Sequence, residues 1–86
     1  MKRQAFARWG GSLKSGTGSV TTDGGGLLKT PFSLASQLGE SPGTSPEELL
    51  AATHAVSFSL ALARELGALE IEPHGIHTTA TVTFEK

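Results

Sequence analysis

The chain has 86 residues, carries a formal net charge of -1 and contains no cysteine. This length allows at most one small domain, and a chain of this size buries only ~60% of its unfolded surface, so we expect a marginal core. The near-neutral charge gives no electrostatic footprint for nucleic acid or an anionic membrane, and neither partner is expected. Without cysteine, the chain has neither a disulfide framework nor a thiolate metal site.

Strands are predicted in the first part of the chain. The segments at 4–9 ("QAFARW") and 17–22 ("TGSVTT") are rich in aromatic or β-branched residues, and the Gly-rich stretch between them suits a hairpin loop. Residues 31–38 place Phe32, Leu34 and Leu38 on one face, which predicts a third, half-buried strand. The basic start at residues 1–11 is not followed by the apolar run of a secretory signal, so a cytoplasmic location is expected.

A long helix is predicted over 46–66. Ser45 can cap it, Pro46 suits its first position, and Glu48 completes a capping box. Gly67 is a natural stop. The alternation in "IHTTATVTFEK" then predicts a last strand over 76–85. The expected fold is therefore a single α+β domain over 1–86 with the order β-β-β-α-β.

The predicted helix lacks a charged face. Between Glu48 and Arg64 the only ionisable side chain is His54, whereas a helix resting on one sheet has charged residues opposite its apolar stripe. The uncharged run is shorter than the ~20 apolar residues of a membrane span. We therefore expect a central helix that is buried on all sides. Because one small sheet covers one side only, a second copy or a missing part of the chain must cover the other.

The sequence resembles the OsmC/Ohr family of osmotically inducible, organic-hydroperoxide-reducing proteins. The resemblance is carried by "RWGGSLKSGTGSVTTDGGGL" followed by "GTSPEELLAATHAVSFSLALA", and its Trp-Gly-Gly hairpin places it nearer OsmC than Ohr. It covers nearly all 86 residues but only the amino-terminal part of the family domain. It implies an intertwined homodimer whose central helices are buried in the interface.

The resemblance also implies the chemistry of a thiol peroxidase that needs no cofactor. In the family, a thiolate attacks the hydroperoxide, an Arg lowers the thiol pKa, a Glu positions the Arg, and a second Cys resolves the sulfenic acid. Carried over by position, the attacking Cys falls on Ser57, the Arg on Gln37, and the Glu on Glu47. Only Glu47 is retained, so we expect no peroxide turnover by this chain.

Three origins remain open for these departures: an engineered Cys-to-Ser change, a natural degenerate member, or a truncated gene or designed half-domain. An alternative function is a non-catalytic dimerising module that binds a small apolar ligand. Val56, Phe58 and Leu60 beside Ser57 would suit such a ligand, or the alkyl tail of an organic hydroperoxide. The same three residues would pack a dimer core equally well.

Simpler interpretations exist for the polar residues. Ser57 can be a small polar residue that bonds back to the carbonyl four residues earlier. It can also form a Ser–His pair with His54, at i-3 on the same helical face, but no oxyanion-hole motif accompanies it. His54 itself is typical of a satisfied core histidine. His74 and His77 would point to opposite faces of a strand, so no metal site is expected.

Overall fold

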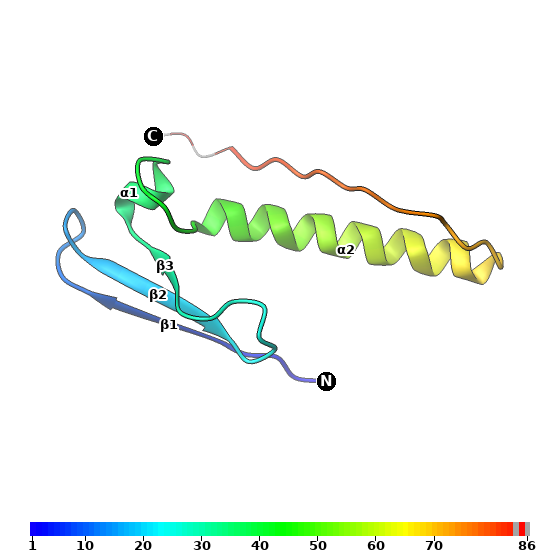
Figure 1. Ribbon diagram of the computed structural model, residues 1–86, viewed down its shortest axis with the longest axis horizontal. Helices are drawn as coiled ribbons and strands as arrows, with labels where there is room; N and C mark the ends of the chain where they lie inside the picture. The colour runs from blue at the N-terminus through cyan, green and yellow to red at the C-terminus, as the bar shows by residue number, and fades with distance from the viewer. Residues whose placement is uncertain (84, 86) are drawn as a thin grey trace. The chain divides into compact units, whose positions relative to one another are not determined.

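A computed structural model describes residues 1–83 and 85, and the chain divides into two compact units, residues 1–46 and residues 47–86. The elements in chain order (Figure 1) are β1 (Ala5–Gly10), β2 (Thr17–Thr22), β3 (Thr30–Phe32), α1 (Leu34–Gln37) and α2 (Pro46–Ala68). The α+β class is confirmed, with a three-stranded antiparallel sheet and one long helix.

The sheet of the first unit has the order β1-β2-β3, and its first two strands lie within a residue of the predicted ranges. Arg8 pairs with Ser19, and Trp9 pairs with Gly18. The hairpin between the strands turns at Gly11, whose φ of 97° suits glycine. The Gly-rich hairpin predicted from the sequence is confirmed.

The two faces of the sheet differ in polarity because successive strand residues point to opposite sides. On one face the rings of Trp9 and Phe32 lie 5.6 Å apart. Gly18 makes room for them, since a Cβ there would lie 2.5 Å from the Phe32 ring. The opposite face carries Arg8 and its partner Ser19. One face therefore carries the Trp9–Phe32 pair, and the opposite face, which we call the polar face, carries mainly polar side chains together with Phe6.

The third strand was predicted too long. β3 ends at Phe32, and residues 34–37 form the single helical turn α1 instead of continuing the strand. The Oγ of Ser33 accepts a hydrogen bond from the Ser36 N–H at 3.0 Å, and the Oγ of Ser36 accepts one from the Ser33 N–H at 2.8 Å. This reciprocal capping box outweighs the alternating pattern that predicted a strand, because it satisfies two backbone donors locally.

Ser36 also links α1 to the loop that follows it. Its hydroxyl donates to the Thr44 carbonyl at 2.8 Å, and the Thr44 N–H donates to the Pro31 carbonyl at 2.8 Å. Ser36 and Thr44 are the two buried polar residues of the described chain, at 8% and 4% exposure. The serine therefore satisfies buried backbone groups on both sides of α1.

We expect Ser36→Ala to lower the free energy of unfolding by about 1–3 kcal/mol, because it leaves the buried Thr44 carbonyl without its donor. Urea unfolding followed by Trp9 fluorescence measures the change. Ser41→Ala is the matched control, since Ser41 is exposed in the same loop. An equal effect of both substitutions would contradict this role of Ser36.

Helix α2 begins at Pro46 as predicted but ends two residues later, at Ala68. Gly67 is not its stop. The Ile71 N–H donates to the Leu66 carbonyl at 2.8 Å and the Glu70 N–H to the Gly67 carbonyl at 2.9 Å, with Glu70 at a φ of 58°. These two bonds and the left-handed residue form a Schellman motif, in which Glu70 takes the place that glycine usually fills.

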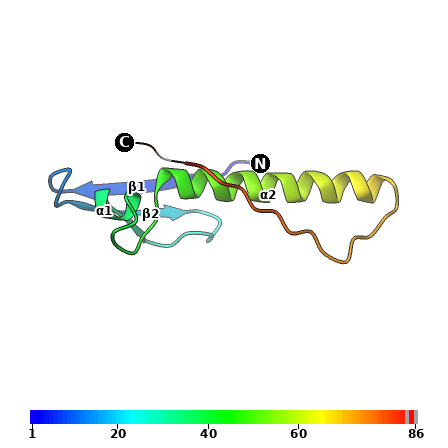
Figure 2. The ribbon, with the colours of Figure 1, turned by 90° about the horizontal axis from the view of Figure 1, so that it is seen from above.

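The final strand predicted over 76–85 does not form in the described residues. The segment after α2 instead runs back along the helix (Figures 1 and 2), and the hydroxyls of Ser59 and Thr78 lie 2.7 Å apart. Its period of two is nevertheless present: residues 76, 78, 80 and 82 are half-buried, whereas 77, 79, 81 and 83 are exposed. Phe84 lies outside the described residues. The segment alternates in exposure without forming the backbone hydrogen bonds of a sheet, because the helix beside it offers no strand edge to pair with.

Helix α2 has no buried residue within the single chain, so the expected burial on all sides stays a prediction about a second copy or a further part of the chain. None of its residues is buried, and within residues 1–83 and 85 no apolar side chain is fully covered. The exposed large apolar residues of α2 are Leu50, Val56, Phe58, Leu60 and Leu62. The one chain therefore supplies only a partial cover for a helix whose sequence has no charged face. No described helix is long and apolar enough to cross a membrane.

Candidate functional site around Ser57

Ser57 lies in the middle of α2 on its more exposed side. A less exposed stripe runs along the helix through Ala51, Ala55 and Ser59, and Ser59 contacts the returning segment through Thr78. Ser57 is two residues from both Ala55 and Ser59, which places it about 160° from the middle of that stripe at 3.6 residues per turn. Ser57, the position predicted to match the family's attacking thiol, therefore faces away from the rest of its own unit.

The hydroxyl of Ser57 has no partner within the described residues. The back-bond to the carbonyl four residues earlier is made instead by Thr53, whose Oγ1 donates to the Leu49 carbonyl at 2.9 Å. His54 is exposed rather than a core histidine, and no hydrogen bond joins it to Ser57 in the part of the chain described. The structure thus shows neither the back-bonded serine nor an assembled Ser–His pair.

The three positions carried over from the family are spread over both units. Glu47 lies in the first turn of α2, where its carboxylate complements the helix dipole. Ten residues of helix separate it from Ser57, which is about 15 Å. Gln37 is the last residue of α1 in the first unit. Glu47 and Ser57 of one chain are therefore too far apart to act on the same small molecule.

The predicted ligand-binding residues are all exposed: Val56 at 59%, Phe58 at 61% and Leu60 at 50%. Val56 and Leu60 are one turn apart and line an open pocket of about 600 Å³ together with Ser59 and residues 76–79. Phe58 does not line this pocket. The three residues therefore belong to two different surfaces of the helix.

The two histidines near the end of the chain, His74 and His77, are both exposed in the returning segment. Among residues 1–83 and 85, no group of three potential ligand side chains comes together.

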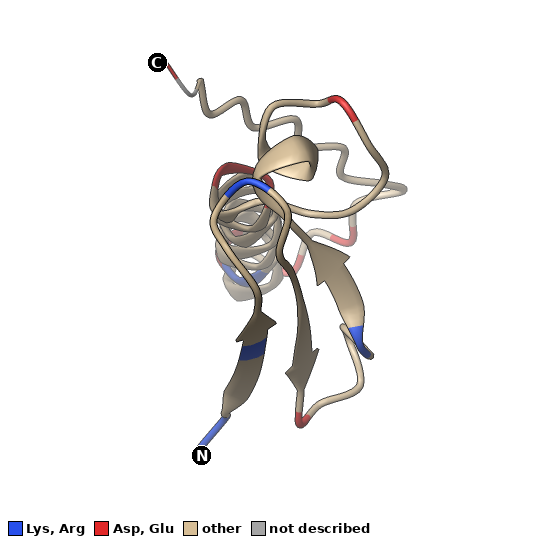
Figure 3. Cartoon of the chain, turned by 90° about the vertical axis from the view of Figure 1, so that its left-hand side faces the viewer, with Lys and Arg blue, Asp and Glu red and all other residues tan. Residues whose placement is uncertain are grey.

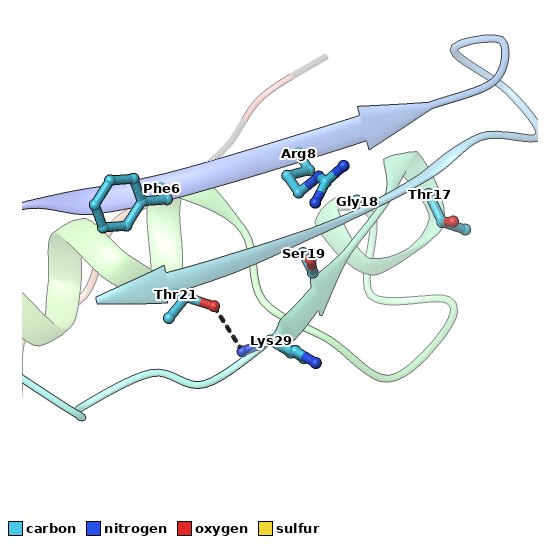
Figure 4. A pocket seen from close by; sticks show the side chains of 7 residues that line it. All are labelled: Phe6, Arg8, Thr17, Gly18, Ser19, Thr21 and Lys29. Atoms are coloured by element: carbon cyan, nitrogen blue, oxygen red, sulfur yellow. Dashed lines mark hydrogen bonds between the residues drawn. The ribbon is translucent and has the colours of Figure 1, made fainter. Parts of the chain in front are cut away.

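The structure also shows a groove that the sequence did not reveal. It is an open pocket of about 560 Å³ on the polar face of the sheet (Figure 4), with a lining that includes Phe6, Arg8, Thr17, Ser19, Thr21 and Lys29. We call it the sheet groove. Arg8 and Lys29 are far apart in the sequence, and only the pairing of β1, β2 and β3 places them on one surface. No motif signals such a site.

Comparison with known proteins decides the family. No protein-family model matches the chain. Two curated relatives are each 41% identical to it over 84 residues, or 98% of the chain: Peroxiredoxin OsmC of Escherichia coli (strain K12) and Peroxiredoxin OsmC of Shigella flexneri. The chain belongs to the OsmC family. It spans 59% of the length of these relatives, and corresponds to the amino-terminal part of the OsmC domain.

Membership of the OsmC family confirms the resemblance found in the sequence. The relatives are peroxiredoxins by name, whereas this sequence has no cysteine.

Proposed function

We propose that this chain is a thiol-free member of the OsmC hydroperoxide-reductase lineage that does not turn over peroxide and acts by associating through α2. The observation that carries the proposal is the absence of cysteine from an OsmC-family sequence. Ser57 occupies the position that the motif "AATHAVSFSLALA" assigns to the attacking thiol.

The chemistry of the family requires sulfur at this position. A thiolate attacks one oxygen of the peroxide bond, the O–O bond breaks, and the alcohol leaves as the sulfur becomes a sulfenic acid. A serine hydroxyl is far less ionised than a thiol near neutral pH, and its oxygen cannot accept a further oxygen atom in a stable, reducible form. Ser57 therefore cannot replace the thiol in either half of the cycle.

The other two positions carried over from the family support the same proposal. Gln37 carries no charge at the position of the family's Arg, so it could neither stabilise a thiolate nor orient a peroxide by charge. Glu47 supports the first turn of α2 whatever the chemistry, because a carboxylate there interacts favourably with the helix dipole. Its retention has a structural reason that does not depend on catalysis.

Association is favoured by the apolar surface of α2. Phe58 is 61% exposed and Leu50 59% exposed, on a helix whose central run has no Asp, Glu, Lys or Arg. Several large, exposed apolar side chains gathered on one element in this way are typical of an interface. A second copy of the chain presents the same apolar surface, so a two-fold contact between α2 helices would cover both copies. In such a pair, a Glu47 from the partner copy could approach Ser57, which the 15 Å spacing forbids within one chain.

A second candidate function rests on the pocket along α2. Val56, Leu60 and Ile76 give the pocket an apolar lining beside the hydroxyls of Ser59 and Thr78. A small apolar ligand could lie there without any catalytic group. Titration with toluene, followed by amide NMR shifts, tests this candidate: shifts centred on residues 55–60 and 76–79 would support it, and their absence would contradict it.

The association proposal is tested by sedimentation equilibrium over a concentration series, with circular dichroism alongside. A folded dimer or higher oligomer that consumes no organic hydroperoxide in the presence of dithiol would support the proposal. A folded monomer at every concentration, an unfolded chain, or measurable peroxide turnover would each contradict it.

A further inference from the structure

The sheet groove presents two cations with no carboxylate among the side chains that line it. Arg8 and Lys29 line it with three hydroxyl residues and Phe6. Within residues 1–83 and 85, neither Arg8 nor Lys29 forms an ion pair, whereas Arg3 lies 4.0 Å from Asp23 at the end of the hairpin. Asp23, the acidic residue closest to Lys29 in the sequence, therefore has Arg3 as its cationic neighbour.

The charge of the chain is distributed unevenly between its units. Five of the seven Lys and Arg residues lie within residues 1–46, together with only two of the eight Asp and Glu residues. Figure 3 marks basic positions on and beside the strands of the sheet. The overall charge of -1 thus conceals a basic first unit, whose field favours an anion at the groove.

The backbone fixes both cations at the groove. Arg8 is centred in β1 opposite Ser19, and Ser19 in turn pairs with Pro31 of β3. Lys29 precedes β3 with a φ of 48°, in the left-handed region that favours glycine, and its N–H donates to the Oγ1 of Thr21 at 3.0 Å. Figure 4 shows Arg8 and Lys29 on either side of Ser19. The Thr21 bond compensates for the left-handed backbone and holds Lys29 beside β2.

The hydroxyl groups that line the sheet groove can donate to a ligand. Thr21 accepts a bond from Lys29, so its own hydroxyl proton remains available to an acceptor. In the described part of the chain, the hydroxyls of Thr17 and Ser19 make no hydrogen bond. Phe6, 56% exposed on the same face, adds an apolar surface at the other end of the groove.

We propose that the sheet groove binds a small organic monoanion, namely a carboxylate with a short apolar chain. The guanidinium of Arg8 matches a carboxylate through paired N–H donors, and Lys29 adds a second positive charge. Ser19 and Thr21 donate to the remaining oxygen lone pairs, and the apolar chain lies along Phe6. This site is independent of the proposed loss of peroxidase activity, since it uses no residue of α2.

The test is titration of the isotopically labelled 86-residue chain with sodium hexanoate, followed by amide NMR shifts. We expect saturable shifts centred on residues 6–8, 17–21 and 29, with no comparable shifts from 1-hexanol. Because both charges are exposed and screened by solvent, Arg8→Gln with Lys29→Gln should weaken binding only about tenfold. Lys14→Gln is the matched control, because Lys14 is exposed in the hairpin loop outside the groove, and should leave the affinity unchanged.

Several outcomes would overturn the proposal. Two of them need only the wild-type chain. The absence of saturable amide shifts with hexanoate would overturn the proposal, and so would binding of 1-hexanol with the same affinity as hexanoate. Tighter binding of inorganic phosphate than of hexanoate would show that the apolar chain is not recognised. An equal loss of affinity in the Lys14→Gln control would show that only the net charge of the unit matters.

Discussion

Replacing Ser57 by cysteine and Gln37 by arginine is expected to give a chain that consumes organic hydroperoxide, where the wild-type chain consumes none. The new thiol restores the atom that accepts oxygen, and the new guanidinium restores a charge that favours the thiolate over the thiol. With no second cysteine to resolve the sulfenic acid, consumption should stop at about one equivalent per chain unless an external thiol is supplied. Peroxide loss, and a mass increase of one oxygen atom in the protein, measure the reaction.

The control for this experiment places a thiol elsewhere on the same helix. Ser59→Cys puts it on the stripe that contacts the returning segment through Thr78, rather than on the side of Ser57. If the two single-cysteine chains react at the same slow rate, position 57 has no special environment. An inert Ser57→Cys, Gln37→Arg chain that remains folded would show that these residues alone do not make the site.

The local elements of the fold follow from local signals. The first two strands and the start of α2 at Pro46 agree with the prediction because hairpin glycines and helix-capping residues act within a few positions. The predicted length of the third strand was wrong because another local signal was overlooked. The side chains of Ser33 and Ser36 each bond to the backbone N–H of the other, and this capping box starts a helical turn where the apolar alternation predicted a strand.

The last predicted strand failed for a different reason. Residues 76–82 alternate in exposure as a strand would, but strand formation needs a neighbouring strand, and the described part of the chain supplies none at this place. A periodic pattern reports which side chains face the rest of the molecule. It does not report what they face.

The candidate sites also differ in whether the sequence could reveal them. Ser57, Gln37 and Glu47 could be singled out only through the family motif, because nothing in their own spacing distinguishes a peroxidase position from a small residue in a crowded helix. Arg8 and Lys29 escaped notice since their proximity depends on the register of three strands. The sequence therefore predicted the uncharged helix α2, but it did not predict the sheet groove, which depends on the pairing of three strands.

The exposed apolar surface of α2 leads to a second prediction with a large effect. Phe58→Glu should weaken self-association of the chain about a hundredfold. The Phe58 ring is the most exposed large apolar side chain in the middle of α2, so it is expected near the centre of an α2–α2 contact. A carboxylate at such a position would be buried without a partner, at a cost of about 3 kcal/mol for the two copies together, which corresponds to about a hundredfold in the dissociation constant. Sedimentation equilibrium of the wild-type and variant chains gives the two dissociation constants.

Leu13→Glu is the matched control, because Leu13 is 69% exposed in the hairpin loop and the change in charge is the same. If it weakens association as much as Phe58→Glu does, the effect comes from added charge rather than from α2. If Phe58→Glu leaves the dissociation constant unchanged while Leu13→Glu also has no effect, α2 is not the interface. A loss specific to Phe58→Glu would instead indicate that the apolar surface of α2, which has no charged residue in its central run and no buried residue in the single chain, contacts a second copy.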